Sequence, residues 1–560
     1  MRSRRAGKRV LLACCAPIVL LVLPELLLRV TGVSRPQPLF VVTDRGELAP
    51  NPEYGLSLPT FLAAGPPPDA RMARTKPGGV LRVFVIGEST VAGFGLYPYS
   101  HIARWLEVRL RELLPEQPFE VINLGIPGID SAGLRYVVHD ALDYQPDLIV
   151  LYAGHNEFLE PNLFRIRQPA TWFFRTLTRD SYLMSAMRRL LFPAQHVSVP
   201  PPQPSGNGPV FDLALITTAE RGRLLGDYEA NLAAMVSESR ARGVRVLLCT
   251  PGSDPRFPPM FAHYSRTLAP AQKQAVRDAC LQARAALEQG TASAAAIASA
   301  RAAIDAAAEI DPAVSLVAYF DGKLAEVSHD PSRARAAFVL ARDLDGRPHR
   351  ASSAIVAIVQ RIAHRFQLPL VETAQRLDDL AFEHAADDEG VFIDHCHPGV
   401  RAQWLIAGLI AQAMARAGWP APEAKWRFAA EPSVAVYLER NPVPEARVAE
   451  IQFKQAMAHL RKWLRATTTG EELEVGRAAA ALAVRLQPRR AAYHGLLGVL
   501  EMLSGRREPA QEHLDLYLRD GPDSLTEIAQ LIERSPELRP IFGRAGLQVA
   551  HGRFELLPAN

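Results

Sequence analysis

The stretch Leu81-Arg82-Val83-Phe84-Val85-Ile86-Gly87-Glu88-Ser89 decides the fold, because in it an apolar run ends at a turn that carries a serine. The run from Leu81 to Ile86, broken only by Arg82, is typical of a buried strand. Open α/β sheets bind their ligands at the carboxyl ends of their strands. We therefore expect Ser89 to lie at that edge of a parallel sheet.

Two further apolar runs end at short polar motifs in the same way. Phe119 to Ile122 precedes Asn123-Leu124-Gly125-Ile126-Pro127-Gly128, and Leu148 to Tyr152 precedes Gly154-His155-Asn156-Glu157. Each motif alone is typical of an ordinary turn, in which glycine accepts a positive φ. Because three strands in succession end at such motifs, the arrangement indicates a shared site rather than coincidence.

A fourth motif, Asp394-His395-Cys396-His397, lies far along the chain and precedes the helix-like stretch Val400 to Met414. Asp394 and His397 are three residues apart, a spacing that places two side chains on one face of a helical turn. Pro398 restricts His397 to extended backbone angles. We expect this turn to direct both side chains toward the sheet.

The remaining pattern is that of an α/β protein, because apolar strands alternate with helical segments. Helical periodicity is clear at Ile102 to Leu114 and Leu225 to Arg242, and further strands are expected at Val244 to Cys249 and Leu368 to Val371. Between them, Phe164 to Phe211 is aromatic and then proline-rich, which predicts a mobile flap over the site.

The four motifs, in this order, resemble the SGNH (GDSL-type) hydrolase family over residues 80 to 270 and 346 to 418. That family usually has Gly-Asp-Ser where this chain has Gly-Glu-Ser. The resemblance implies a three-layer α/β sandwich with a parallel, flavodoxin-like sheet. It further implies that Ser89 is the nucleophile, His397 its base and Asp394 the group that orients His397. Gly128 and Asn156 match the oxyanion positions, beside the backbone N–H of Ser89.

The chemistry of these residue types agrees with the roles that the resemblance implies. A serine hydroxyl is a poor nucleophile at neutral pH unless an imidazole takes its proton. A carboxylate on the other ring nitrogen fixes the tautomer and stabilises the imidazolium. We therefore expect an esterase that acts on acyl esters or carbohydrate O-acetyl groups through an acyl-enzyme, without a cofactor. A polysaccharide O-acyltransferase of the same fold and a non-enzymatic repeat scaffold are the alternatives.

Two other histidines and a metal compete for roles at this site. His155 is expected to be a loop or packing histidine, and His395 to matter less than His397, because Asp394 is the partner of His397. A metal at Asp394-His395-Cys396-His397 is disfavoured, since zinc sites usually draw ligands from two separate elements and no second Cys or His pair occurs nearby.

The amino terminus indicates export and membrane attachment. Five basic residues precede an apolar run from Val10 to Leu28 that contains Pro17, Pro24 and Glu25; they are Arg2, Arg4, Arg5, Lys8 and Arg9. Basic residues stay on the cytoplasmic side, so the catalytic part is expected to face the periplasm or the cell exterior. An uncleaved anchor is favoured because no Ala-x-Ala-like site follows, with a cleaved signal as the rival.

Composition excludes some partners. The chain has 560 residues, enough for two or three domains, and a formal charge of only +4. Because no long basic block occurs in the body of the chain, nucleic acid is not an expected partner. Three cysteines lie beyond the amino-terminal segment, and Cys249 and Cys396 are expected to be free, buried thiols.

Two regions follow a different, helical pattern with a period of thirty-four residues. Ala300, Ile304 and Ala307 recur as Ala334, Phe338 and Ala341, and Pro488 recurs as Pro522. Both regions resemble tetratricopeptide repeats, with ordinary helical hairpins as the alternative. We expect an anchor at 1–33, a linker or covering segment at 34–80, a hydrolase domain split between 81–279 and 346–420, a repeat insertion at 280–345 and a helical repeat domain at 421–560.

The segment from Arg342 to Arg350 joins the inserted repeats to the last strand and is dense in charge. A solvated linker is the default interpretation. Arg347 and Arg350 are the candidates for binding an anionic or sugar substrate. The expected partners are thus an acyl-ester or acetylated glycan substrate, a membrane, and a protein that binds the repeats.

Overall fold

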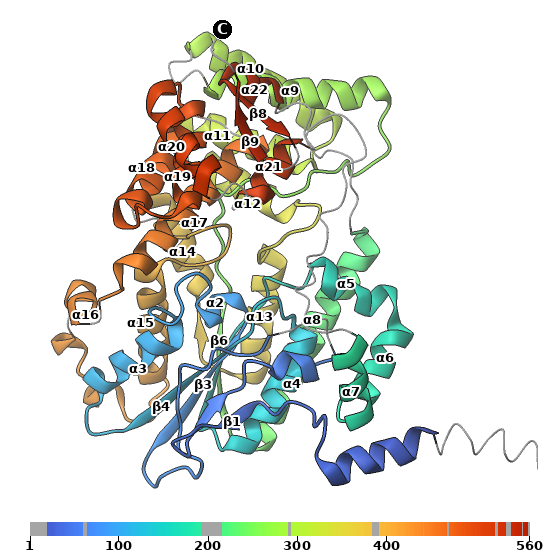
Figure 1. The fold of residues 1–560 in the computed structure, drawn as a ribbon, viewed down its shortest axis with the longest axis vertical. Helices are drawn as coiled ribbons and strands as arrows, with labels where there is room; N and C mark the ends of the chain where they lie inside the picture. The colour runs from blue at the N-terminus through green and yellow to red at the C-terminus, as the bar shows by residue number, and fades with distance from the viewer. Residues whose placement is uncertain are drawn as a thin grey trace, which may run out of the picture.

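The structure is a computed structural model, and its parts lie along one long axis (Figure 1). It describes residues 20–59, 64–191, 216–288, 293–383, 391–431, 433–440, 442–466, 470–520, 525–533, 539–550 and 553–557. The sheet lies at one end of this axis and the two helical regions lie at the other.

A five-stranded parallel sheet forms the centre of the α/β part, with strand order β4-β3-β5-β6-β7. The strands are β3 (Leu81–Gly87), β4 (Phe119–Gly125), β5 (Leu148–Tyr152), β6 (Arg245–Cys249) and β7 (Leu370–Val371). Gly87 lies in register with both Gly125 and Tyr152, so the carboxyl ends of the three motif-bearing strands are level. The predicted α/β fold with a parallel sheet is confirmed.

Helices cover both faces of this sheet and complete three layers (Figure 1). One face packs against α3 (Ile102–Leu113), α14 (Thr373–Glu383) and α15 (Val400–Arg416). The other packs against α4 (Ser131–Ala141), α8 (Thr218–Ala241) and α13 (Ser353–Phe366). Each helix turns its apolar face toward the sheet, as the helical periodicity of the sequence requires.

Arg82, the one charge in β3, is buried and compensated. Its guanidinium lies 2.9 Å from the Glu120 carboxylate of β4 and donates to the Ala73 carbonyl oxygen at 3.0 Å. Glu120 also accepts the Ala73 N–H. The segment before the sheet thus packs onto it, with a hairpin of β1 (Phe40–Val42) and β2 (Leu48–Pro50) followed by the short η1 (Tyr54–Ser57).

Three helices occupy much of the predicted flap: α5 (Glu160–Arg167), α6 (Pro169–Leu177) and α7 (Tyr182–Leu191). Its proline-rich part lies outside the described residues. A helix over residues 20–31 contacts α7, because Glu25 accepts the N–H groups of Tyr182 and Leu183. In the described part of the chain no helix is both long and apolar enough to cross a bilayer, and residues 1–19 of the predicted anchor lie outside that part.

Both helical regions consist of paired helices. The inserted region contains α9 (Pro270–Glu288), α10 (Ala294–Ile310), α11 (Ser315–Val327) and α12 (Pro331–Asp343), so it begins before residue 280. The six residues that carry the predicted repeat there are all buried: Ala300, Ile304, Ala307, Ala334, Phe338 and Ala341. Paired helices agree with either interpretation, so the tetratricopeptide assignment stays a prediction.

The carboxy-terminal region contains α17 (Glu445–Ala466), α18 (Gly470–Leu486), α19 (Ala491–Leu503), α20 (Arg507–Asp520), α21 (Thr526–Glu533), α22 (Arg539–Arg544) and a hairpin of β8 (Leu547–Ala550) and β9 (Arg553–Leu556). It meets the inserted region where the Arg284 guanidinium lies 5.8 Å from the Trp463 ring. The segment before it, including α16 (Val434–Arg440), packs on the hydrolase domain. There Glu431 pairs with buried Arg109, and the Tyr437 ring packs at a tilt against Trp404 with the centroids 4.2 Å apart.

Candidate active site

Ser89, Asp394 and His397 lie together at the carboxyl edge of the sheet. His397 Nε2 is 2.8 Å from the Ser89 hydroxyl oxygen, and His397 Nδ1 is 2.7 Å from Asp394 Oδ2. With Nδ1–H donating to the carboxylate, Nε2 is free to accept the serine proton. The structure therefore brings Ser89 of one motif together with Asp394 and His397 of another, in the order that a serine nucleophile needs.

The turn that carries Asp394 and His397 is not helical, so the geometric reason given for their pairing is wrong. Phe392 and Pro398 form an antiparallel bridge, and the residues between them form a tight loop. Asp394 Oδ1 accepts the backbone N–H groups of Cys396 and His397, both at 3.0 Å. The loop therefore folds around the carboxylate, and this fixes the His397 ring beside it.

The ionised form of Asp394 is strongly favoured. Burial alone raises the pKa of this carboxyl, but the neighbouring His397 and His395 and the donated hydrogen bonds outweigh burial and hold the pKa well below its usual range. A permanently charged Asp394 stabilises the imidazolium that forms when His397 takes a proton.

Ser89 begins the short helix α2 (Ser89–Ala92), directly after β3. Gly87 allows this sharp exit from the strand. A Cβ at residue 87 would lie 2.1 Å from the Tyr152 carbonyl oxygen and 2.5 Å from Val91, so no side chain fits. Ser89 thus reaches the edge through a close contact between two strands.

The two predicted oxyanion residues lie on neighbouring loops beside Ser89. Gly128 has a φ of +79°, which favours glycine. The Asn156 side-chain amide donates to the Ile129 carbonyl oxygen at 3.0 Å, and an amide nitrogen has a second N–H. The two loops therefore support each other, while their role toward an oxyanion stays a prediction.

Glu88 is a residue whose importance the sequence did not reveal. It is fully buried, and its carboxyl accepts the backbone N–H groups of Gly154, His155 and Asn156 at 2.8 to 3.3 Å. Glu88 therefore holds the loop of Asn156 against the turn of Ser89. Its position beside the serine, between two predicted strand ends, was the available signal.

Burial has a large effect on Glu88. Burial first, and the nearby Glu157 second, raise the pKa of Glu88 to about 8, although the three N–H donors lower it. Glu157 is also buried, and it accepts the N–H and the hydroxyl of Ser131 at the start of α4. Two carboxyl groups thus brace the loops behind the catalytic serine.

His155 and His395 are placed differently from His397. His155 is buried, and its Nδ1 accepts the Ala351 N–H at 3.1 Å. Burial, followed by the charges of His397 and His395, lowers the pKa of His155 to about 3, so its ring is neutral and packs in the loop. His395 Nδ1 lies 3.6 Å from Asp394, farther than His397. Both positions agree with the expectation that His397 is the base.

Asp394, His395 and Cys396 offer ligand atoms within 4.8 Å of one another, the spacing of a metal site. Asp394 is already bonded to His397, and burial raises the pKa of the Cys396 thiol well above its usual range. A thiol binds metal only after it loses its proton. This set therefore fits a metal poorly, and the expectation of catalysis without metal or cofactor stays a prediction. Cys249 and Cys396 are free and buried, as expected.

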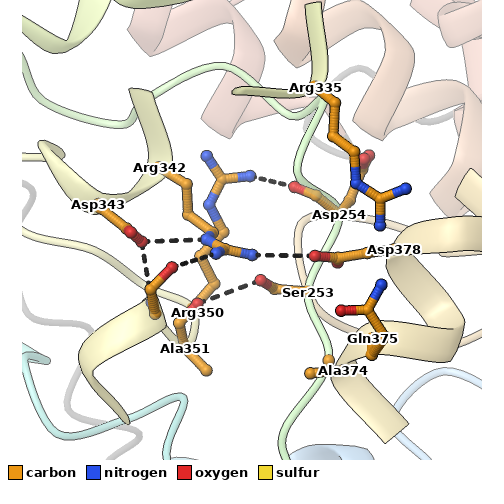
Figure 2. Close-up of polar contacts among 12 residues, drawn as sticks. Ser253, Asp254, Arg335, Arg342, Asp343, Arg350, Ala351, Ala374, Gln375 and Asp378 are labelled. Carbon is orange, nitrogen blue, oxygen red and sulfur yellow. Dashed lines mark hydrogen bonds and ion pairs between the residues drawn. The ribbon is translucent and has the colours of Figure 1, made fainter. Parts of the chain in front are cut away.

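Arg350 is a structural residue, so its predicted contact with substrate is not supported. It is 2% exposed, and its guanidinium donates to the carbonyl oxygens of Asp254 and Phe257. Figure 2 shows Arg350 beside Arg342 of α12, which lies 3.7 Å from Asp378. The Asp254 N–H in turn donates to the His395 carbonyl oxygen, so Arg350 supports the catalytic turn from behind.

Arg347 is also buried, and its guanidinium lies 4.8 Å from the Phe261 ring. A role for Arg347 toward substrate stays a prediction.

Ser89 and His397 are largely buried. Ser89 and His397 are each 8% exposed, and the Phe94 ring lies 4.5 Å from the His397 ring. On the outer side of Phe94, the Lys454 ammonium group of α17 lies 5.3 Å from its ring. Leu96, Ile393 and Ile451 form a small apolar cluster beside it. The carboxy-terminal helices thus contact the loops that carry the site.

The chain is similar to one known family and, more distantly, to several solved structures. Residues 85–289 match the GDSL-like Lipase/Acylhydrolase family. Among solved structures, the acetylxylan esterase Axe2 from Geobacillus stearothermophilus is 14% identical, covering 60% of this chain and 94% of that chain, with a TM-score of 0.29. The lipase/acylhydrolase from Enterococcus faecalis is 13% identical, covering 60% and 95%, with a TM-score of 0.27.

No curated protein matches the sequence. The family match covers the motifs of Ser89, Gly128 and Asn156, whereas Asp394 and His397 lie beyond it and are placed by the structure. Residues 85–289 are therefore similar to the GDSL-like lipase/acylhydrolase family, and the protein is an enzyme that acts on ester bonds.

Proposed function

We propose that this protein cleaves short acyl esters, such as the O-acetyl groups of a glycan, through an acyl-enzyme on Ser89. The observation that carries the proposal is the continuous line of hydrogen bonds from the Ser89 hydroxyl through His397 to Asp394, with distances of 2.8 and 2.7 Å. Such a line is what a serine needs to become a nucleophile at neutral pH.

In the first step, Ser89 Oγ attacks the ester carbonyl carbon while His397 Nε2 takes the hydroxyl proton. The carbonyl oxygen becomes an oxyanion, and the N–H of Ser89, the N–H of Gly128 and the amide of Asn156 donate to it. The bond to the alcohol oxygen then breaks, and His397 returns its proton to the leaving alcohol. Water repeats the sequence on the acyl-enzyme and releases the acid.

The surroundings of Ser89 favour a particular size of acyl group. Phe94 packs against His397, and Ser89 has little exposure. Because a long acyl chain needs an open groove beside the nucleophile, this enclosure favours an acetyl or similarly short group.

A second candidate is transfer of the acyl group to a polysaccharide hydroxyl. The same enclosure favours it, because the loss of an acyl-enzyme to water depends on how well water is excluded. The two reactions share the first half and differ only in the acceptor. The presence of the family's serine hydrolase elements sets aside a purely non-enzymatic scaffold.

One assay separates these reactions. Full-length protein in detergent is incubated with acetyl and long-chain esters and with an acetylated glycan, with and without a deacetylated glycan acceptor. Free acetate as the main product supports the hydrolase, and acetyl groups on the acceptor, seen by mass spectrometry, support the transferase. The absence of both products, with Ser89→Ala as the blank, would contradict the proposal.

We also propose that the amino-terminal segment anchors the enzyme with its catalytic domain in the periplasm or outside the cell. The basic cluster that begins at Arg2 supports this orientation, and the helix at 20–31 exposes Leu20, Leu23 and Leu27. A carboxy-terminal reporter that works only outside the cytoplasm is expected to be active. Activity of a cytoplasmic reporter instead would contradict the orientation.

The helical regions are proposed to bind a protein partner. Stacked helical hairpins of this kind present extended surfaces to other chains. Cross-linking of the enzyme in intact membranes is expected to join partner proteins to α9–α12 or α17–α20. Cross-links confined to the hydrolase domain would contradict this role.

A further inference from the structure

A cavity of about 550 Å³ lies between α4, α8 and the α5–α6 pair, on the helical layer beside the catalytic edge. Its volume falls within the range of about 300–1,000 Å³ that small-molecule sites occupy. Its polar and aromatic lining includes Arg135, Tyr136, Arg165, Trp172, Thr176, Arg223, Asp227 and Asn231. None of these side chains takes part in the chemistry assigned to Ser89.

Arg165, in the wall of this cavity, is buried but not fully bonded. Its guanidinium lies 3.4 Å from Asp130 and 3.5 Å from Asp227, and its side chain is 8% exposed. Yet Nε and Nη2 have no hydrogen-bond partner of suitable geometry among the described residues. Nη2 is the atom that lies 3.4 Å from Asp130, so its contact is an ion pair without a well-formed hydrogen bond. Because a buried donor without a hydrogen bond destabilises the fold, these N–H groups are suited to an acceptor that arrives with a ligand.

A second orphan atom lines the same cavity. The Thr176 hydroxyl oxygen of α6 is buried and, within the described part of the chain, has no hydrogen-bond partner either. Two elements of the wall, α5 and α6, therefore each contribute to the lining a residue whose buried polar atoms make no hydrogen bond. This independent observation indicates a ligand rather than a local defect of packing.

The charge of the lining selects the sign of that ligand. Arg135 and Arg223 are exposed, and neither forms an ion pair with any residue in the described ranges. Arg135 has only a weak contact of 3.4 Å with the Asn231 side-chain oxygen. Asp227 is the acidic residue of the lining and already lies beside Arg165. Asp130 and Asp227 both lie beside Arg165, so the charge in excess comes from Arg135 and Arg223, and this excess favours an anion.

The uncharged part of the lining selects a sugar over a lipid tail. Tyr136 and Trp172 supply aromatic surface, while Thr176 and Asn231 supply a hydroxyl and an amide. Sugar rings present apolar C–H faces to aromatic rings and hydroxyl groups to polar side chains, whereas an acyl tail needs a wholly apolar wall. A sugar that carries a carboxylate meets both the charge and the lining.

The cavity is joined to the catalytic loops through two short connections. Asp130, which contacts Arg165, caps α4 just after the oxyanion glycine Gly128. Asn162, one turn before Arg165 on α5, donates to the carbonyl oxygens of Gly128 and Asn156 at 3.3 and 2.8 Å. A ligand held by Arg165 is therefore held by the same helix that braces the oxyanion loops.

We propose that this cavity is a subsite for an acidic sugar residue, and that Arg165 binds its carboxylate while Arg135 and Arg223 attract it. The inference rests on the proposed action of Ser89 on a glycan ester, and it extends that function to glycans that contain uronic acids.

Binding without turnover tests the subsite directly. The full-length Ser89→Ala protein is titrated by calorimetry with an unacetylated oligomer of uronic acid sugars and with a neutral oligomer of equal length. We expect the acidic oligomer to bind at least about tenfold more tightly, and to weaken as salt rises. Equal affinity for the two oligomers would overturn the proposal.

Substitutions in the same background locate the site. Arg165→Met keeps an unbranched stem but removes the guanidinium, and it is expected to lower affinity at least about tenfold, and Arg223→Gln by a few-fold. Arg416→Gln, on exposed α15 surface away from the cavity, is the matched control and is expected to change nothing. Arg223 is exposed, so its variant keeps the test decisive if Arg165→Met fails to fold.

Unchanged affinity in Arg223→Gln and Arg165→Met would overturn the assignment. Competition by inorganic phosphate alone, without discrimination between the sugars, would show a general anion site instead and would equally overturn it. Hydrolysis of a simple acetyl ester by the unaltered protein is measured separately. Absence of this hydrolysis would count against the proposed function. The subsite would still be judged separately, by sugar binding to the Ser89→Ala protein.

Discussion

The carboxyl edge of the sheet and the carboxy-terminal helices are both well packed, but different atoms hold them together. At the edge, buried polar groups from distant segments bond to one another, as Ser89 does with His397 and Glu88 with the backbone of His155. In the helical hairpin of α19 and α20, small residues let two helices meet, as Gly498 does against Leu514.

This difference predicts which substitutions lower turnover and which lower stability. A polar change at the edge removes a bond that positions a reacting group, so turnover falls. A size change between helices strains packing, so stability falls while the chemistry is left intact. The predictions below test that separation, beginning with the largest effect.

Removing the base or the nucleophile is expected to have the largest effect. His397→Ala and Ser89→Ala should each lower kcat by about four orders of magnitude or more, and the double variant should be little worse than either, because the residues act as one unit. His395→Ala is the matched control and should cost far less, since its ring lies farther from Asp394. Steady-state kinetics on an acetyl ester would measure this, and a reversed order of the two histidines would contradict the assignment.

Loss of an oxyanion donor comes next. Asn156→Ala should lower kcat by about two to three orders of magnitude while the protein stays folded, because the removed amide acts on the transition state. Circular dichroism would check the fold and kinetics the rate. Turnover at the level of the unaltered protein would mean that another donor serves the oxyanion.

The helical region should respond in stability alone. A Cβ at residue 498 would lie 2.7 Å from Leu514, so Gly498→Val should lower the free energy of unfolding of this region by about 1–3 kcal/mol with kcat for an acetyl ester unchanged. Gly226→Ala, a helical position with open space around it, is the control that should not destabilise. A large fall in kcat for folded Gly498→Val would break the separation.

The last prediction is a dependence of stability on pH. Burial, followed by Glu157, raises the pKa of Glu88 to about 8 in the folded protein, from an ordinary value of 4.5. Between these values the folded protein keeps a proton that the unfolded chain releases. The free energy of unfolding should therefore fall as pH rises through this window, by at most about 1.4 kcal/mol per pH unit for this group.

Glu88→Gln keeps the side chain neutral at every pH, so its urea-unfolding free energy should vary less steeply between about pH 5 and pH 8. Glu157 retains its own contribution, so some slope should remain. An equal slope in both proteins would show that Glu88 does not carry the proton.

The sequence predicted the elements whose signals are local. The strands that end at Gly87, Gly125 and Tyr152 lie where their apolar runs indicated, and Asp394 and His397 share one turn because they are close in sequence. Contacts between distant segments could not be predicted from the sequence. Nothing in the pattern showed that Glu88 would hold the loop of Asn156.

Arg350 and Tyr437 differ from expectation for the same reason, which is that each contacts a distant part of the chain. The charge around Arg350 suggested a solvated or binding segment. Its guanidinium instead donates to the backbone carbonyl oxygen of Asp254, a residue 96 positions earlier in the chain. Tyr437 falls in the helical repeat domain expected at 421–560 but packs on Trp404 of α15, and the local sequence does not reveal which surface it covers.

Labelling with a fluorophosphonate, which reacts only with an activated serine, tests the central claim most directly. In the full-length protein, mass spectrometry should find the label on Ser89, with no label in Ser89→Ala and greatly slowed labelling in His397→Ala, because His397 activates the hydroxyl. Labelling of another serine, or undiminished labelling of Ser89→Ala, would contradict the assignment of Ser89 as the nucleophile.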